Sequence, residues 1–260
     1  MTTLTAHEVS ARLGGRLILD GVDLTVAPGR VTALVGPNGS GKTTLLRSCY
    51  RALPVSAGMV SVDGADIASL RRRALARTVG ASTQEPVSLG GITVRESVRL
   101  GRTVTRGPFE AFGPDDYAIV AEVLARVGLT ELAERDVLAL SGGERQRVSI
   151  ARTLAQQPEV LLLVEPTNHL DLHQQLSVLT LLRELAASGL AVLVTLHDLR
   201  MAAEYCDSVA VLHRGRLVAT GAPEEVLDAA VLRDVFGVRG QVRARPDGRR
   251  TLDVVGLADV

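Results

Sequence analysis

Apolar residues gather in short runs that are separated by polar or glycine-rich segments along most of the chain. Runs with the length of buried strands are each followed by a turn or by a segment with helical spacing. They lie at Val31–Val35, Val160–Val164, Ala191–Leu196 and Ser208–Leu212. Strands that alternate with helices favour a mainly parallel sheet covered on both faces. The pattern therefore predicts an α/β fold.

The segment before Val31 follows a different pattern. Leu17–Leu19 and Val22–Val26 are short apolar runs, interrupted by Asp20-Gly21 and followed by Ala27-Pro28-Gly29. Glycine and proline at these places favour tight turns. We expect short antiparallel strands here, ahead of the parallel sheet.

The middle of the chain, residues 85–157, is predicted to be helical. Asp115-Asp116 stands where it can cap the start of one helix. Apolar residues then recur at helical spacing, at Tyr117, Val120, Val123, Leu124 and Val127. Glycine and proline in Thr103–Pro114 predict a surface loop before this helix.

These patterns divide the chain into three parts. We expect a core made of residues 1–84 and 158–240, a helical subdomain at 85–157 and a tail at 241–260. Residues of the tail alternate around Pro246-Asp247-Gly248, which predicts a β-hairpin.

Composition excludes several classes of protein. The chain has 260 residues, of which 46% are hydrophobic, and its 29 basic and 29 acidic residues leave no net charge. This balance gives no long-range attraction to nucleic acid, so no nucleic-acid partner is expected. The two cysteines, Cys49 and Cys206, are too few for a disulfide framework and indicate a reducing compartment.

No apolar run approaches the roughly 20 residues needed to cross a bilayer. The N-terminal residues also lack the basic start and apolar core of a secretory signal. We therefore expect a cytoplasmic location.

One residue stands out in the composition, because Lys42 is the only lysine among the 29 basic residues. A lysine retained where arginine serves everywhere else indicates a role that a guanidinium cannot fill. Lys42 lies in a glycine-rich segment that follows the strand Val31–Val35 and opens a helix.

That segment matches the phosphate-binding pattern G-x-x-x-x-G-K-[ST]. Its residues are Gly36, Pro37, Asn38, Gly39, Ser40, Gly41, Lys42 and Thr43, with Thr44 next in the chain. Glycines let the loop curl so that backbone N–H groups meet phosphate oxygens at a helix N-terminus. Lys42 would contact the β- and γ-phosphates, and the Thr43 hydroxyl would bind Mg²⁺.

A second motif, Leu140-Ser141-Gly142-Gly143-Glu144-Arg145-Gln146, opens another predicted helix. Serine at the N-cap with glutamate three residues later is by itself a good helix start. Taken with the phosphate loop, however, the segment closely resembles the signature sequence of ABC ATPases. The resemblance covers residues 4–237. It implies an α/β fold with a RecA-like P-loop core, an N-terminal antiparallel β subdomain and an inserted helical subdomain.

The resemblance also implies roles for individual residues. Ser141, Gly142 and Gly143 would contact the γ-phosphate of ATP held by another subunit. Four further positions match family motifs: Gln84 as a magnesium ligand that couples to a membrane partner, Glu165 as the general base for water, Asp171 as a contact across the dimer, and His197 as a γ-phosphate contact.

Two positions depart from the family pattern. Val164 stands where the family has an aspartate that holds magnesium-bound water, and such a loss costs about 10–100-fold in metal affinity or activity. Leu13 stands where the family commonly stacks an aromatic ring on adenine. We expect ATP to bind, somewhat more weakly than usual, and hydrolysis to be slow.

With one P-loop and one signature, the chain is expected to be a separate subunit. Two segments resemble ATPases of importers for iron-siderophore, haem and cobalamin: Glu85–Gly101, and the ending Gly221-Ala-Pro-Glu-Glu-Val followed by Leu232–Val238. That resemblance implies a homodimer or heterodimer, integral-membrane permease subunits, an indirect link to a substrate-binding protein, and a place on the cytoplasmic face of the membrane. The alternative is a hydrolysis-deficient regulatory module. An ABC ATPase of DNA repair is excluded by the missing coiled-coil or zinc insertion.

Overall fold

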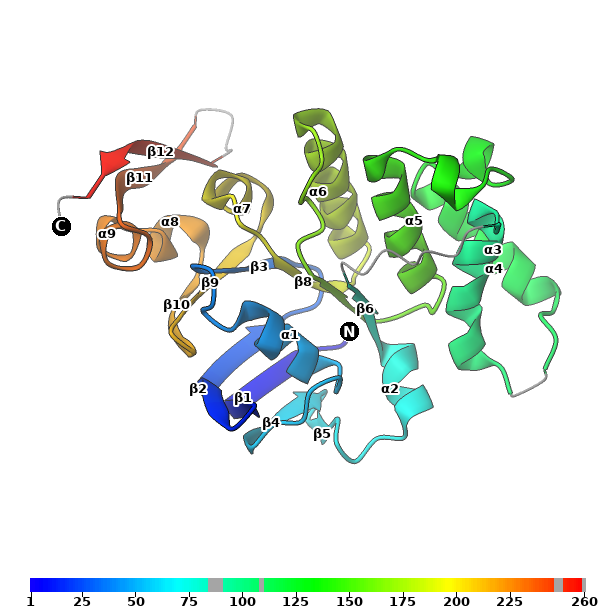
Figure 1. The fold of residues 1–260 in the computed structure, drawn as a ribbon, viewed down its shortest axis with the longest axis horizontal. Helices are drawn as coiled ribbons and strands as arrows, with labels where there is room; N and C mark the ends of the chain where they lie inside the picture. The colour runs from blue at the N-terminus through cyan, green and yellow to red at the C-terminus, as the bar shows by residue number, and fades with distance from the viewer. Residues whose placement is uncertain (84–90, 108–109, 246–249, 259–260) are drawn as a thin grey trace.

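A computed structural model describes residues 1–83, 91–107, 110–245 and 250–258. Its main sheet has the strand order β10-β9-β3-β8-β7-β6 (Figure 1). The strands are β3 (Val31–Val35), β6 (Val79–Ser82), β7 (Val160–Leu163), β8 (Ala191–Thr195), β9 (Ser208–His213) and β10 (Arg216–Gly221). All neighbours are parallel except β9 and β10. The predicted α/β fold with a mainly parallel sheet is confirmed.

A second, antiparallel sheet has the order β2-β1-β4-β5. Its strands are β1 (Leu4–Leu13), β2 (Arg16–Val26), β4 (Ala57–Val62) and β5 (Ala65–Asp66). The prediction that Asp20-Gly21 breaks the chain into short strands was wrong, because β2 runs through it. Val9 pairs with Val22 and Ala11 with Leu19, so β2 takes up one extra residue as a bulge. Gly21, with φ of 60°, permits the bulge.

The main sheet separates two layers of the core. Along β7, Leu161 and Leu163 face one layer, which also contains apolar residues of α5 (Gly142–Leu154) and α6 (Leu172–Ala187). Val160, Leu162 and the following Val164 face the other layer, between the two sheets. Helix α1 lies in this second layer (Figure 1). The core helices are α1 (Lys42–Cys49), α2 (Arg72–Thr78), α6 (Leu172–Ala187), α7 (Leu199–Tyr205), α8 (Pro223–Val226) and α9 (Ala229–Phe236).

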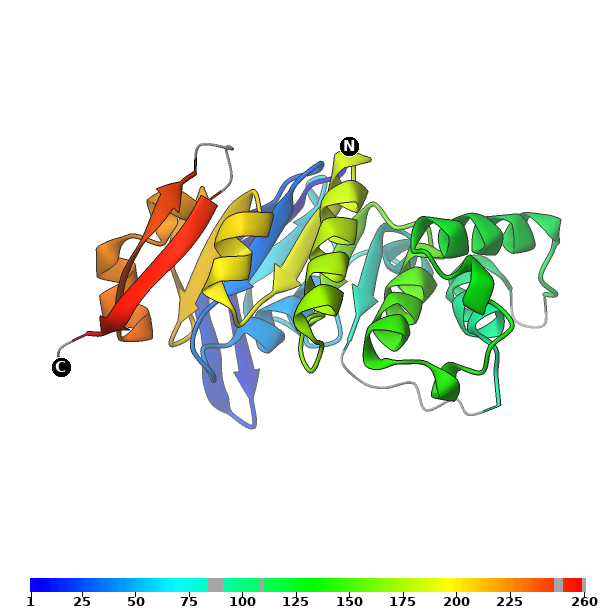
Figure 2. The same cartoon turned by 90° about the horizontal axis from the view of Figure 1, so that it is seen from above.

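The middle of the chain forms helices that lie together at one end of the molecule (Figure 2). They are α3 (Val94–Arg99), the 3₁₀ segment η1 (Leu100–Thr105), α4 (Pro114–Arg126), η2 (Thr130–Leu132), η3 (Val137–Ala139) and α5 (Gly142–Leu154). The predicted loop Thr103–Pro114 begins inside η1, because the hydroxyls of Thr103 and Thr105 donate to carbonyls three residues earlier. Residues 108 and 109 lie outside the described part.

Asp116 does more than cap α4. Its carboxylate accepts the Gly113 N–H at 2.9 Å and Arg102 Nε at 3.0 Å, and it also pairs with Arg106. Burial alone would raise the pKa of Asp116, but these hydrogen bonds lower it overall. Arg102 also donates to the Ala155 carbonyl at 2.7 Å. The side chains of Arg102 and Asp116 therefore join η1, α4 and the end of α5.

The C-terminal strands β11 (Val238–Ala244) and β12 (Arg250–Leu257) pair antiparallel, with Val242 opposite Leu252. They lie at the opposite end of the molecule from the helical group (Figure 2). The predicted turn at Pro246-Asp247-Gly248 lies outside the described residues. Leu252 is buried in the main core, so the hairpin is packed onto the domain.

Both cysteines are free and buried. Burial raises the pKa of the Cys49 thiol to about 12 and also raises the pKa of Cys206. Of the described helices, none has both the length and the apolar character needed to span a bilayer.

The two thiols predict a loss of stability at high pH. Below pH 9 both states hold the thiol protons. Above it the unfolded chain ionises first, so the free energy of unfolding falls as pH rises from about 9 towards 12. Denaturant unfolding at pH 8 and 10.5 checks this, beside a C49A/C206A variant whose decline is expected to be smaller. Equal declines in both proteins would contradict it.

Candidate functional site

The predicted phosphate loop connects β3 to α1. Gly36 has φ of 152°, and a Cβ there would lie 2.0 Å from the Leu212 carbonyl oxygen. Gly41 is the N-cap of α1 with φ of 107°, and a Cβ there would lie 2.8 Å from a methyl of Leu19. A side chain at either position would push the loop away from β9 or β2. Glycine is required at both by the surrounding strands.

Lys42 lies under this loop. Its Nζ donates to the carbonyl oxygens of Gly36 at 2.6 Å and Pro37 at 3.1 Å, and the residue is only 6% exposed. Burial lowers the pKa of Lys42, and the negative charge of Glu165 opposes this in part. The ammonium group is thus held in place by backbone carbonyls at a cost in solvation that an anion would offset.

Several donors around the loop fit a phosphate group. Helix α1 has no side-chain cap and no acidic residue in its first turn. The Ser40 hydroxyl is buried without a hydrogen-bond partner in the described part of the chain. Free N–H groups at a helix start and an unsatisfied hydroxyl both favour an anion at this place.

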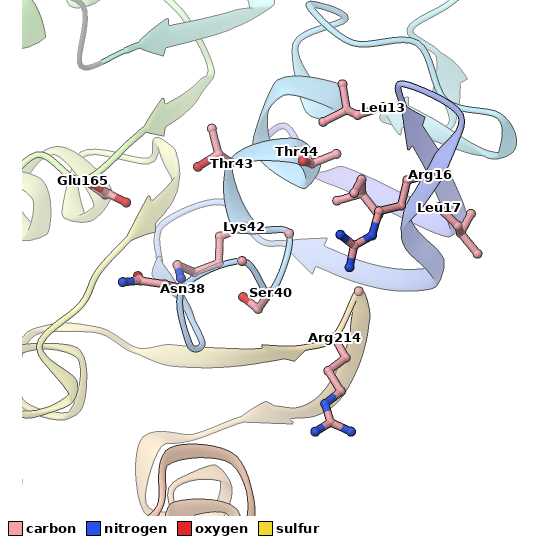
Figure 3. Close-up of a pocket in the computed structure, with 14 residues that line it drawn as sticks. Leu13, Arg16, Leu17, Asn38, Ser40, Lys42, Thr43, Thr44, Glu165 and Arg214 are labelled. Carbon is pink, nitrogen blue, oxygen red and sulfur yellow. The ribbon is translucent and has the colours of Figure 1, made fainter.

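An open pocket of about 720 Å³ lies over the loop (Figure 3). One side is the phosphate loop, from Asn38 to Thr44, with Glu165 facing it. The other side is formed by Leu13, Arg16, Leu17, Ile18, Arg214 and Gly215. The pocket therefore joins a charged end at Lys42 to an end with leucine and arginine side chains.

Glu165 lies two residues after the end of β7, at the carboxyl end of the parallel strands. Its φ of 49° is unusual for a residue with a side chain. Its N–H donates to Thr195 Oγ1 at 2.8 Å, and its two carboxylate oxygens lie 2.7 Å from His197 Nε2 and 2.6 Å from Asn168 Nδ2. These contacts hold the carboxylate beside the phosphate loop, with the predicted residue His197 against it.

Val164 is 8% exposed and packs in the core layer that contains α1. Its N–H donates to the Ser82 carbonyl at 3.1 Å. A valine fits this apolar layer well. Its side chain offers no oxygen to a metal. The described pocket lining has side-chain oxygens at Asn38, Ser40, Thr43, Thr44 and Glu165. Gln84, the other predicted magnesium ligand, lies outside the described residues.

The signature residues lie elsewhere. Ser141 caps α5: its hydroxyl accepts the Glu144 N–H at 3.3 Å, and its N–H donates to the Glu144 carboxylate at 2.7 Å. Asp171 caps α6 through the Gln174 N–H. A Cβ on Gly143 would meet the Gln174 side chain at 2.7 Å, so the starts of α5 and α6 lie side by side. The described pocket lining includes none of Ser141, Gly142, Gly143 and Asp171.

Four residues of the site were not given a role by the sequence. Thr195 and Asn168 hold Glu165, and Arg16 and Arg214 line the pocket. Arg16 was open to prediction, because a Gly14-Gly15 turn places it opposite Leu13. The contact of the Arg214-Gly215 turn with the phosphate loop joins residues far apart in the chain, which no local pattern indicates.

Comparison with known proteins agrees with this geometry. A family model described as ABC transporter matches residues 19–168. The chain is 42% identical over 239 residues to the achromobactin transport ATP-binding protein CbrD of Dickeya dadantii, covering 92% of this chain and 89% of that protein. It is 45% identical over 241 residues to the hemin import ATP-binding protein HmuV of Streptomyces coelicolor, covering 93% and 85%.

Among solved structures, cbiO1 of Clostridium perfringens, part of the ABC transporter complex cbiONQ, superposes with a TM-score of 0.77. Its sequence is 30% identical, and the match covers 85% of this chain and 89% of that one. The fold of this chain is therefore shared with a component of an ABC transporter complex.

Proposed function

The chain belongs to the ABC transporter family, and from this premise we propose that it is the ATP-binding and ATP-hydrolysing subunit of an importer for iron-siderophore, haem or cobalamin. One observation carries the proposal: the buried ammonium of Lys42, the unpartnered Ser40 hydroxyl and the carboxylate of Glu165 line or adjoin one pocket. The relatives named above, which transport achromobactin and hemin, support the substrate class.

In this proposal the triphosphate binds along the phosphate loop. Gly36 and Asn38–Gly41 supply backbone N–H groups, Lys42 supplies the compact cation, and Ser40 supplies a hydroxyl. The Thr43 hydroxyl would hold Mg²⁺, with Gln84 as a second ligand. The ion would neutralise charge on the phosphate oxygens. Thr44 extends the loop into the first turn of α1.

Glu165 then orients the attacking water and accepts its proton. His197, 2.7 Å from the carboxylate, would hold that group and reach the γ-phosphate. Asn168 and the Thr195 hydroxyl fix the remaining freedom of Glu165. A base held on both oxygens needs little rearrangement when the phosphate arrives.

The signature residues would act on the nucleotide of a second subunit. Ser141 and Gly142 are exposed at the start of α5 and Gly143 is buried beside them, and all three lie outside this chain's own described pocket lining. A helix N-terminus is suited to meet a γ-phosphate presented by a partner. Asp171, next to them at the start of α6, would lie at the same dimer interface.

We further propose that the subunit binds a permease at the cytoplasmic face of the membrane. Residues 85–157 would form a helical subdomain that moves with nucleotide state on the core of 1–84 and 158–240. A cleft beside β6, lined by Tyr50, Arg72, Leu75 and Val79, adjoins the segment that leads to Gln84. Closure of the dimer would pull on permease loops there.

Replacing Val164 with Asp tests the proposed slow hydrolysis. The V164D variant is expected to raise ATP turnover about tenfold or more and to strengthen Mg²⁺ dependence, because a carboxylate can hold magnesium-bound water. The same change is expected to lower the melting temperature without nucleotide, since it buries a charge in an apolar layer. Steady-state hydrolysis and nucleotide affinity with and without Mg²⁺ measure both effects.

V164N is the matched control, because it has the same size without the charge. It should leave turnover low. Equal turnover in the wild type and V164D would show that Val164 does not limit hydrolysis. If the wild type and V164D both bind nucleotide but neither has measurable turnover, the result would favour the alternative of a regulatory module. That alternative rests on Val164 and Leu13.

A further inference from the structure

The end of the pocket away from Lys42 is formed by the tip of the β1–β2 hairpin. Gly14 and Gly15 both have positive φ and make a two-residue turn, so Leu13 and Arg16 pair directly across the strands. Side chains of directly opposite residues lie on the same face of a sheet. An apolar surface and a guanidinium therefore stand side by side where the base of a nucleotide would lie.

Arg16 extends from β2 towards the phosphate loop, whereas Leu17 points away from it (Figure 3). Two nearby arginines have partners: Arg12 donates to the Gly15 carbonyl at 2.9 Å, and Arg216 bonds to Asp20. Arg16 lines the pocket and has no hydrogen-bond or ion-pair partner among the described residues. Its donors are available to a ligand.

Arg214 also lines the pocket, and its guanidinium extends away from the phosphate loop (Figure 3). It precedes Gly215, whose N–H donates to the Ser40 carbonyl at 2.9 Å and whose own carbonyl accepts the Asp20 N–H at 2.9 Å. A Cβ at Gly215 would lie 2.3 Å from the Ile18 carbonyl oxygen, so the turn is seated tightly against β2. The backbone that carries Arg214 is thus fixed to the phosphate loop.

Among the described residues that form this end, the side chains offer a hydrogen-bond donor and no acceptor. Leu13, Leu17 and Ile18 are apolar, and the guanidinium of Arg16 only donates. Guanine presents two acceptors, O6 and N7, on one edge, and a guanidinium can bond to both. Adenine presents one acceptor and one donor on that edge, so its amino group would face a cation.

We propose that Arg16 selects the base, so that the pocket binds GTP at least as tightly as ATP. This rests on the proposed function, because the triphosphate must first be held at Lys42. Leu13 contacts the face of the base, and Arg16 donates to its O6 and N7 edge. The subunit then uses guanosine as well as adenosine triphosphate.

The test measures the dissociation constants of the magnesium complexes of ATP, GTP and inosine triphosphate. Inosine has O6 and N7 but lacks the guanine amino group, so it isolates the edge that Arg16 would contact. In the wild type, GTP and inosine triphosphate are expected to bind at least as tightly as ATP. R16L should weaken both about tenfold relative to ATP, the value of one good bidentate contact.

Two further variants separate base recognition from general charge. R16K keeps the charge without the planar fork, so it should retain affinity for ATP but lose the preference for O6 and N7. R30L removes an exposed arginine at the far end of β3 and should change nothing. Equal weakening of all three nucleotides in R16L would overturn the proposal, as would tenfold tighter binding of ATP by the wild type. Failure of every nucleotide to bind would overturn the proposed function too.

Discussion

Replacing Glu165 with Gln is expected to lower ATP turnover by about 10²–10⁴-fold, the usual contribution of a general base, while nucleotide affinity changes little. Glutamine has nearly the same shape, so the contacts with Asn168 and His197 can be retained in part. It cannot accept the proton of the attacking water. The loss should therefore appear in kcat.

Single-turnover hydrolysis and equilibrium nucleotide binding measure this effect together. The wild-type turnover is itself expected to be slow. E165Q is therefore best made also in the V164D background, where the expected turnover of the parent is higher and a large loss can be measured. E184Q is the matched control, because it neutralises an exposed carboxylate on α6 outside the site. Turnover of E165Q within twofold of its parent would show that another group activates the water.

Replacing Lys42 with Met is expected to weaken nucleotide binding about a hundredfold or more. Two charge-assisted hydrogen bonds to phosphates, each worth about 1.5–3 kcal/mol, would be lost. Without nucleotide the same change should raise the melting temperature, because burial lowers the pKa of Lys42 and the charged form is held at a cost.

Calorimetric binding and thermal unfolding of one preparation check both halves of this result. Because the pKa of Lys42 is lowered, the wild type without nucleotide gains stability from this residue as pH rises towards 10.5. The stability gap between K42M and the wild type should therefore narrow over that range. K42R serves as the control for charge. Unchanged ATP affinity in K42M would remove Lys42 from the site.

The main sheet could be predicted because each of its central strands is a contiguous run of apolar residues. The runs at β3, β7, β8 and β9 are mainly apolar because both faces of the sheet are covered. The phosphate loop is likewise contiguous. The capping box of Ser141 and Glu144 forms as its spacing indicates. In each case the determining interactions lie within a few residues.

Features that depend on distant contacts were missed. Asp20-Gly21 reads as a turn, yet the pairing of β1 on one side turns it into a bulge. Asp116 reads as a helix cap, yet two arginines from the preceding segment bury it. Arg214 reaches the pocket only because the β9–β10 turn is bonded to Ser40. None of these contacts produces a periodic pattern of residues from which it could be predicted.

The ion pair of Arg102 and Asp116 has a mechanical consequence. Arg102 ties η1 to α4 through Asp116 and to the residue after α5 through the Ala155 carbonyl, and a Cβ at the adjacent Gly101 would lie 2.0 Å from the Arg152 carbonyl oxygen. These contacts hold η1, α4 and α5 closely together at one point. Helix α3 continues directly into η1, so a displacement of α3 is expected to move α5 with it. Ser141, at the start of α5, would then change position together with α3.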